Sequence, residues 1–374
     1  MPDKSYTLLA QDGDARRGVF HSFHGDVQTP FFMPIATVGA IKGGLEAMEV
    51  RDLGFELILS NTYHLHVRPG EERVKAFGGL AKFMGWDGPI LTDSGGFQAW
   101  SLAKMNQITE EGITFKSHLD GSPIILTPES VIDIQRSLGI DVAMALDECT
   151  DYPCSYDEAK ASMERSMRWA ARRKKHWQDT GADESMYLFG IGQGSFFKDL
   201  RSESAKILAD LDLPGYAVGG VVVDFTRRHE AILPSMPHLP KDRPRYLMGV
   251  GTPLDILNAV ELGIDMFDCV LPTRNGRHGK VFTTYGDVNL NAAKWKDSDQ
   301  LIDEENDNPV SKKYTRGYLR HLFHVNESLG GRLATLHNLS FYGNLMKGIC
   351  QSIDEGNFAK FKANFIEKYS SGNA

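Results

Sequence analysis

The chain has 374 residues, of which 41% are hydrophobic and 24% are charged, and its formal net charge is −8. This length accommodates one barrel domain of roughly 250 residues with appended segments. No apolar run reaches the roughly 18 residues that a membrane helix needs, and the N-terminus lacks the apolar core of a signal peptide. The negative charge argues against indiscriminate coating of nucleic acid, but it leaves room for a local basic groove. We therefore expect a cytoplasmic protein without membrane association.

The four cysteines of the chain form no C-x-x-C pair. A domain of this size does not depend on disulfides for its stability, so we expect reduced thiols.

Eight short and nearly continuous apolar segments recur along the chain, as expected of strands that are buried on both faces. Helical patterns lie between most of them. The clearest is 155–178, where Met163, Met167 and Trp169 can share a buried side. Strand–helix alternation predicts parallel pairing with right-handed crossovers, so we predict an α/β fold, a (β/α)8 TIM barrel. The predicted strands are 31–36, 56–60, 89–93, 141–147, 187–192, 215–220, 246–250 and 264–268.

One insertion interrupts this pattern. Residues 112–126 alternate apolar and polar side chains around Asp120-Gly121, which predicts an inserted β-hairpin. Thr127-Pro128 then predicts a helix start, with threonine as the N-cap and proline in the first turn.

The C-terminal part also departs from a plain barrel. Residues 299–345 begin with a polar, turn-rich run and continue with a helix-like segment at 311–329, while 352–374 has the pattern of a surface helix. We therefore predict a catalytic barrel over 1–298 and a C-terminal helical lobe over 299–374, packed on the barrel.

Carboxylates stand at the ends of three predicted strands, which is the usual layout of a (β/α)8 active site. Asp268, at the end of the last strand, is able to attack the anomeric carbon of a sugar. The carboxylate of Asp147 suits the N–H donors of a guanine-like base. Asp93 precedes Ser94-Gly95-Gly96, where the glycines allow a ligand to approach the backbone closely.

Each carboxylate has a structural alternative. Asp93 and Asp147 are also suited to capping the helix that follows, and Asp268 to a salt bridge with Arg274 or Arg277.

Two weaker signals lie nearby. Gln193 and Gly219-Gly220 end two further strands, and neither means much alone. The basic segment 271–280 suits a polyanionic substrate, or it is a solvated loop.

Taken together and in order, these motifs resemble the queuine tRNA-ribosyltransferase family, the bacterial-type tRNA-guanine transglycosylases. The resemblance runs from about residue 8 to 370 and rests on SNTYHLHVRPG, LTDSGGFQ, SHLDG, DECT, SMRWA, GQGS, YAVGG, YLMGVG, GIDMFDCVLPTRNGR and HNLSFY. It implies a pentosyltransferase of queuosine biosynthesis that exchanges guanine at the tRNA wobble position for a 7-deazaguanine base. The implied partners are this tRNA and the free base, and no cofactor takes part in the reaction.

The resemblance also implies residue roles. Asp268 is implied as the nucleophile that forms a covalent ribose intermediate, and Asp93 as the general acid/base. Two displacements at one carbon predict retention and ping-pong kinetics. Arg274 and Arg277 are implied to meet the anticodon loop, whose target base must leave its stack. The implied base pocket consists of Ser94, Phe97, Asp147, Cys149, Gln193, Gly219, Gly220, Val221 and Met248.

The sequence departs from the family at its structural zinc, which a C-x-C-x2-C…H pattern holds. Those positions here are Asn306, Asn308, Ser311 and His337. Without the three thiolates we predict no bound metal. In the family this lobe borders the homodimer interface. The resemblance therefore leaves a homodimer open for this chain. We expect hydrogen bonds and apolar packing to hold the lobe instead, with Tyr314, Tyr318, Leu319, Leu322 and Phe341 as the packing residues.

The base pocket departs as well. Phe225, beside Asp224, replaces a glutamate that reads the side arm of the base, and Phe97 replaces the tyrosine usual in bacterial members. This weakens the expectation of an aminomethyl-deazaguanine substrate and leaves queuine open. Two other functions remain: a non-catalytic RNA-binding partner subunit, and a paralogue that inserts the base into another nucleic acid.

Overall fold

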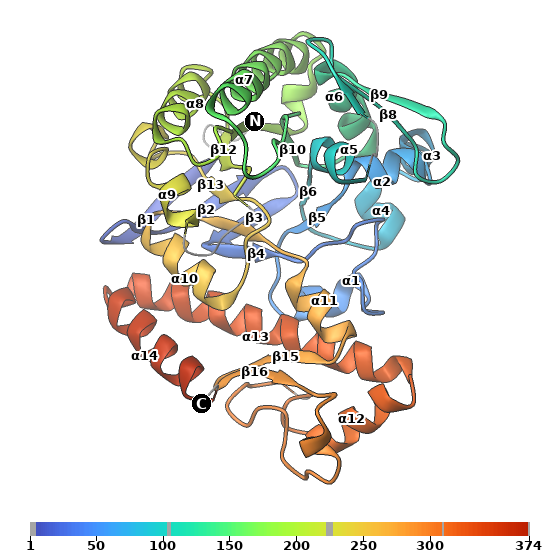
Figure 1. Ribbon diagram of the computed structural model, residues 1–374, viewed down its shortest axis with the longest axis vertical. Helices are drawn as coiled ribbons and strands as arrows, with labels where there is room; N and C mark the ends of the chain where they lie inside the picture. The colour runs from blue at the N-terminus through green and yellow to red at the C-terminus, as the bar shows by residue number, and fades with distance from the viewer. Residues whose placement is uncertain (1–4, 103–105, 222–226, 309, 373–374) are drawn as a thin grey trace.

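Eight parallel strands form a closed barrel at the centre of the protein (Figure 1). The computed structural model describes residues 5–102, 106–221, 227–308 and 310–372. The strand order is β4-β14-β13-β12-β11-β10-β6-β5, and a parallel bridge between Ile35 and Leu59 joins its two ends. The strands are β4 (Phe31–Met33), β5 (Ile58–Ser60), β6 (Ile90–Thr92), β10 (Val142–Met144), β11 (Tyr187–Gly192), β12 (Gly215–Val218), β13 (Arg245–Leu247) and β14 (Met266–Asp268).

The predicted (β/α)8 barrel is confirmed, and each strand lies within or next to its predicted segment. Most are shorter than predicted, because an apolar run marks burial rather than ladder pairing. Ala145 and Leu146, for example, are buried although β10 ends at Met144.

Helices surround the barrel, and the two that the sequence analysis located lie where it predicted them. The predicted helix 155–178 is α7 (Tyr156–Asp179), with Ser155 as its N-cap. Thr127 caps α6 (Pro128–Leu138) through a bond from the Ser130 amide. The other helices around the barrel are α1 (Ala47–Asp52), α2 (Thr62–Val67), α3 (Glu71–Ala76), α4 (Leu80–Met84), α5 (Gly96–Leu102), α8 (Lys198–Asp210), α9 (Arg228–Ile232), α10 (Pro253–Glu261) and α11 (Leu271–Arg277), with short 3-10 helices at Ala182–Glu184 and Met236–His238.

Two antiparallel sheets flank the barrel. The predicted hairpin 112–126 is confirmed as β8 (Ile113–Lys116) and β9 (Pro123–Leu126), to which β7 (Asn106–Ile108) adds a third strand. The other sheet, β1 (Tyr6–Asp12), β2 (Ala15–Ser22) and β3 (Gly25–Thr29), was not predicted. Phe20 of this sheet packs on the rings of Tyr187 and Phe189. The sheet thereby covers the end of the barrel where the strands begin, and the other end is left for ligands.

The C-terminal lobe lies across the barrel along one long helix, α13 (Ser328–Asp354) (Figure 1). The predicted continuous helical segment 311–329 is wrong. The helix α12 (Arg316–His324) stops because Asn326 adopts a left-handed conformation with φ 56°, and α13 starts afresh. The predicted tail helix is α14 (Phe358–Ser371), which a turn at Gly356 separates from α13. Three short elements precede residue 299, and Val281 and Leu290 of this segment pack with the lobe. They are β15 (Lys280–Thr283), β16 (Gly286–Asn289) and a 3-10 helix at Ala293–Trp295.

A small hydrophobic cluster of its own holds this lobe together. Members of this cluster lie on both sides of residue 298, where the sequence analysis placed the domain boundary. The boundary itself stays a prediction. Leu319 and Leu322 belong to it as expected, whereas Tyr318 is exposed and Phe341 packs with the main core instead. The cluster consists of Val281, Leu290, Ile302, Val310, Leu319, Leu322, Leu333 and Ala334.

Among the described residues, no helix combines the length and the apolar character needed to cross a membrane.

Candidate active site

Predicted site residues from six strands meet at the rim where the parallel strands end, and four of them carry polar side chains. Asp268 is the last residue of β14, and Asp93 directly follows β6. Asp147 comes three residues after β10. Because all eight strands run the same way, these ends share one edge of the barrel. Gln193, Gly219 and Met248 directly follow β11, β12 and β13.

Asp93 lies in a cradle of donors. Its carboxylate accepts hydrogen bonds from Asn61 Nδ2 (2.5 Å), the Thr62 amide (2.9 Å) and Gln98 Nε2 (2.8 Å). Burial nevertheless raises the pKa of Asp93 to about 6, and the negative charge of Asp268 adds to this rise. A carboxyl group with this pKa can both give and take a proton near neutral pH.

Asp93 does not cap the helix that follows it in the chain, so this structural alternative is wrong. The hydroxyl of Ser94, not the carboxylate of Asp93, accepts from the Gly96 amide at the start of α5 (3.2 Å). Asp93 bonds instead to the first turn of α2, through Thr62.

Asp268 is held by two donors that both bond to Oδ1. Tyr246 donates its hydroxyl (2.5 Å), and Gly249 donates its amide (2.7 Å). Within the described residues Oδ2 accepts no hydrogen bond, so it remains available to attack a substrate. Neither Arg274 nor Arg277 contacts this carboxylate among the ion pairs of the described chain, so the salt-bridge alternative is wrong. Burial raises the pKa of Asp268, and the two donors oppose that rise.

Asp147 forms the centre of a second polar group. Gln193 Nε2 donates to Oδ2 (2.6 Å), Ser94 Oγ lies 3.4 Å from Oδ1, and Cys149 Sγ lies 3.9 Å from Oδ2. Burial raises the pKa of Asp147 to about 6, and the charge of Asp93 contributes. Since Ser155 caps α7, the capping alternative for Asp147 is wrong.

Gly219 and Gly220 pack directly on this group. A Cβ atom at Gly219 would lie 3.1 Å from Gln193 Nε2, and one at Gly220 would lie 2.5 Å from Gln193 Oε1. Glycine is favoured at the second position because φ there is +65°, a left-handed conformation that a residue with a side chain rarely adopts. The two glycines bring their backbone within reach of whatever Asp147 and Gln193 hold.

The three carboxyl groups share one electrostatic environment. The charge of Asp268 raises the pKa of Asp93, and the charge of Asp93 raises that of Asp147. Like charges act on each other in this way only at close range. The three carboxyl groups thus form one cluster of acidic side chains at the rim.

The remaining predicted pocket residues differ in exposure. Val221 is fully buried, Met248 is half-buried, and Phe97 is exposed, with its ring against Trp100. Asp224 and Phe225, the predicted departure from the family, lie outside the described residues.

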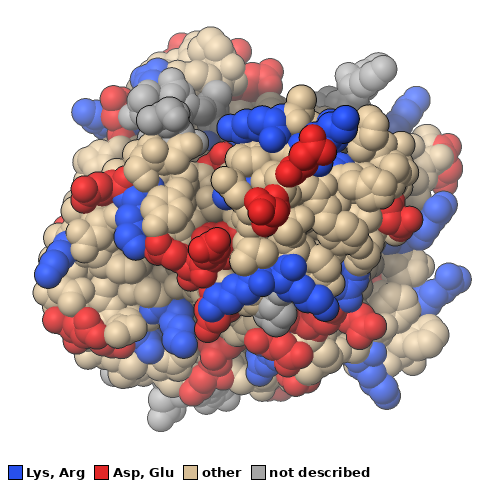
Figure 2. Space-filling view, turned by 90° about the horizontal axis from the view of Figure 1, so that it is seen from below, with Lys and Arg blue, Asp and Glu red and all other residues tan. Residues whose placement is uncertain are grey.

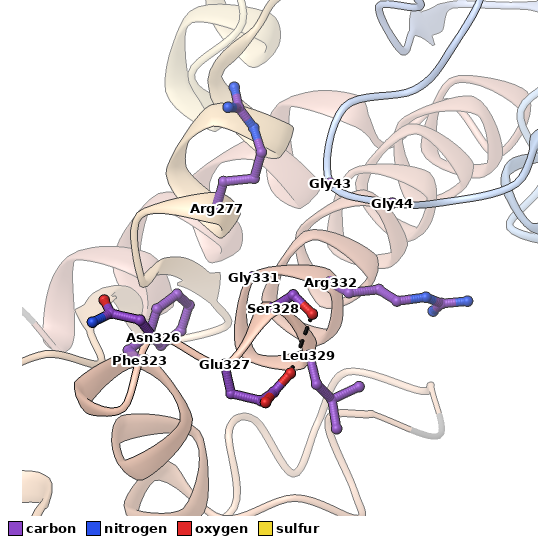
Figure 3. A pocket seen from close by; sticks show the side chains of 10 residues that line it. All are labelled: Gly43, Gly44, Arg277, Phe323, Asn326, Glu327, Ser328, Leu329, Gly331 and Arg332. Carbon is purple, nitrogen blue, oxygen red and sulfur yellow. Dashed lines mark hydrogen bonds between the residues drawn. The ribbon is translucent and has the colours of Figure 1, made fainter.

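Arg274 and Arg277 are exposed on α11, directly after the strand that carries Asp268. They line a recess of about 240 Å³ together with Lys42 and His278. Arg277 also borders a second recess of about 530 Å³, across which stands Arg332 of α13 (Figure 3). Arg332 is paired with Glu49 (2.6 Å). This cationic edge beside the rim suits a phosphate backbone.

Charges of both signs alternate over the face seen from below in Figure 2, so that face offers no uniformly basic surface. This fits the net charge of −8.

Three of the four positions of the family's zinc site, Asn308, Ser311 and His337, form a buried hydrogen-bonded network. The fourth, Asn306, accepts instead from Asn344 Nδ2 (2.7 Å), and its own Nδ2 has no partner in the described chain. Asn308 Oδ1 accepts from the amides of Val310 and Ser311 (both 2.9 Å), and Asn308 Nδ2 donates to Ser311 Oγ. Ser311 Oγ bonds to His337 Nδ1 (2.6 Å), and His337 Nε2 bonds to the Phe282 carbonyl (2.7 Å).

This network does not fit zinc. Both ring nitrogens of His337 are engaged, and the other groups are neutral amide or hydroxyl oxygens in place of thiolates. Burial lowers the pKa of His337 to about 4, so the ring is neutral at physiological pH. No cluster of three or more His, Cys, Asp or Glu side chains suited to a metal occurs in the described part of the chain.

The sequence missed several residues of the site. Asn61 directly follows a predicted strand, so the same strand-end rule that selected Asp93 would have found it. Tyr246 lies within an apolar segment, where nothing distinguishes it from a core residue.

This chain is similar to known proteins over nearly its whole length. The family model described as queuine tRNA-ribosyltransferase matches residues 11–371. A queuine tRNA-ribosyltransferase of Clostridium perfringens (strain 13) is 50% identical over 377 residues, which cover 99% of each chain. One from Clostridium kluyveri is 48% identical, covering 98% of this chain and 99% of the relative. One from Francisella tularensis subsp. novicida is 49% identical, covering 97% and 98%.

Proposed function

The chain belongs to the queuine tRNA-ribosyltransferase family of pentosyltransferases, and we propose that it exchanges guanine at the tRNA wobble position for a 7-deazaguanine base. The observation that supports this most directly is the shared rim of Asp93, Asp147 and Asp268, with Asp268 Oδ2 free of hydrogen bonds in the described chain. The base that enters is an aminomethyl-deazaguanine or queuine.

In the first half-reaction, Asp268 Oδ2 attacks C1′ of the wobble ribose. The C1′–N9 bond breaks, its electron pair stays with guanine, and Asp93 supplies a proton to the departing base. Tyr246 and Gly249 hold Oδ1, so the free oxygen is oriented by two fixed bonds. The product is an ester between Asp268 and the ribose.

In the second half-reaction, Asp93 takes a proton from the incoming base, whose nitrogen then attacks C1′. The ester bond breaks and returns the carboxylate of Asp268. Two displacements at one carbon retain its configuration. In the ester the negative charge of Asp268 is absent, which removes one of the causes that raise the pKa of Asp93.

Asp147 and Gln193 give this exchange its preference for guanine-like bases. The carboxylate of Asp147 is an acceptor for the N1–H and the exocyclic amine, and Gln193 is a donor for the carbonyl. Arg274 and Arg277 meet the phosphates of the anticodon loop.

The exchange is tested by incorporation of labelled guanine into a tRNA with guanine at the wobble position. We expect Asp268→Asn to lower the exchange rate by about 10⁴-fold or more while tRNA binding is retained. Asp297→Asn, an exposed aspartate remote from the rim in sequence, is the matched control. RNA binding without any exchange by the unchanged protein would instead identify a non-catalytic partner subunit. Faster incorporation into DNA than into tRNA would identify a paralogue with another substrate.

We also propose that the C-terminal lobe folds without zinc. Support comes from the hydrogen bonds that occupy Asn308, Ser311 and His337. The homodimer stays a prediction, which sedimentation of the purified protein would test.

A further inference from the structure

A fully buried arginine lies behind the base pocket and touches only backbone oxygens among the described residues. Arg201, in the first turn of α8, has 0% of its surface exposed. Nε donates to the Ser195 carbonyl (2.7 Å), Nη1 to those of Gly192 (3.0 Å) and Gly219 (2.8 Å), and Nη2 to that of Gly220 (3.4 Å). Burying a guanidinium without a carboxylate partner is costly, so the arrangement requires an explanation.

The four carbonyls belong to the two strand ends that carry the pocket. Gly192 is the last residue of β11 and Ser195 lies two residues after Gln193, while Gly219 and Gly220 follow β12. Ser195 has a left-handed backbone with φ 50°, an unfavourable conformation for a residue with a side chain. Its bond to Arg201 helps to hold that turn. Arg201 therefore links the two rim loops through hydrogen bonds, and none of the groups that it contacts there is charged.

The hydrogen bonds from Arg201 fix the direction of two peptide units, Gly219–Gly220 and Gly220–Val221. In a planar trans peptide the C=O and the N–H point in opposite directions. Since the carbonyls of Gly219 and Gly220 turn toward Arg201, the amides of Gly220 and Val221 turn away from it. Neither amide donates a hydrogen bond in the described part of the chain. A Cβ atom at Gly219 would lie 3.1 Å from Gln193 Nε2 and 3.7 Å from Asp147 Oδ2, so this turn packs against the two side chains that line the base pocket.

We propose that Arg201 is a positioning residue that aims the amides of Gly220 and Val221 at the 6-oxo group of the purine. This role rests on the transglycosylase function proposed above. When the C1′–N9 bond breaks, the electron pair left on N9 is delocalised onto the 6-oxo oxygen until Asp93 protonates the base. Donors fixed in advance stabilise such a developing charge. A cation behind their peptide units strengthens them as donors.

The test compares Arg201→Met and Arg201→Lys with Arg136→Met, an exposed arginine on α6, as control. We expect Arg201→Met to lower kcat/KM for guanine by about 10²-fold, with a smaller loss for Arg201→Lys, and KM for tRNA to stay nearly constant. An unchanged kcat/KM for guanine in Arg201→Met would overturn the proposal.

A second measurement separates positioning from general loosening of the pocket. Inhibition constants are measured for guanine and for 2-aminopurine, which lacks the 6-oxo group. We expect Arg201→Met to raise the inhibition constant for guanine by at least about tenfold. The inhibition constant for 2-aminopurine should stay unchanged. Equal weakening of both bases would contradict the proposal.

If the variants do not fold, the unchanged protein labelled with 15N-glycine gives the answer. Guanine should move the Gly220 amide proton downfield, and 2-aminopurine should not. An absent guanine shift would overturn the inference. Absence of exchange by the unchanged protein would refute the proposed function instead, because the contrast between the two bases reports on binding alone.

Discussion

The acid/base group of the proposed reaction is tunable, because hydrogen bonds to Asp93 oppose the effect of its burial. Gln98 Nε2 donates one of them (2.8 Å). A bond from a neutral donor to a charged acceptor contributes about 1.5–3 kcal/mol, and 1.36 kcal/mol corresponds to about one pKa unit. Gln98 is only half-buried, so we take the lower end. Gln98→Met should then raise the pKa of Asp93 by about one unit, because the ionised form loses a donor.

This shift has a defined kinetic consequence. The second half-reaction needs ionised Asp93, so kcat/KM for the incoming base should rise with pH through an apparent pKa at or below about 6. At the pH of the wild-type midpoint, the variant would be ionised to about 9% instead of about 50%, and therefore about fivefold slower. At a pH two units above this midpoint, the rates of the variant and of the wild type should nearly coincide.

The assay measures labelled guanine incorporation from pH 5 to 8.5 at saturating tRNA. Gln178→Met, an exposed residue near the end of α7, controls for the substitution itself. A midpoint that stays or moves down in Gln98→Met, or a loss of equal size at every pH, would refute the assignment of Asp93 as the base.

Two further predictions concern the polar network of the C-terminal lobe. Elemental analysis should find no stoichiometric zinc in the purified protein, whereas a variant with Asn306→Cys, Asn308→Cys and Ser311→Cys should bind about one equivalent; one equivalent in the unchanged protein would contradict the reasoning. The folded-state pKa of His337 (about 4) lies below that of an unfolded histidine, so the unfolded state takes up the proton first and stability falls as pH drops from about 6.5 toward 4. Between pH 7.5 and 5.5 the unchanged protein should lose about 1.3 kcal/mol more unfolding free energy than His337→Gln, as measured by urea denaturation, and parallel pH dependences would show that His337 is not buried in neutral form.

The sequence by itself determined the barrel and most of its rim. Strands buried on both faces need continuous apolar runs, so the eight segments were visible without coordinates. Parallel strands end at one edge, which is why Asp93, Asp147, Gln193 and Asp268 could be selected by position alone. Local capping chemistry likewise marked the start of α6 at Thr127, and the apolar pattern of 155–178 marked α7.

Only the tertiary structure decided which buried polar atoms pair. Tyr246 holds Asp268 across 22 residues of sequence, and Ser311 bonds to His337 across 26. Arg201 looks like any helix arginine until four carbonyls from two loops surround it. Periodicity records which side of an element is buried, but not the partner it meets there. A polar group that leaves water must find its partner in space, and that choice is made when distant segments pack.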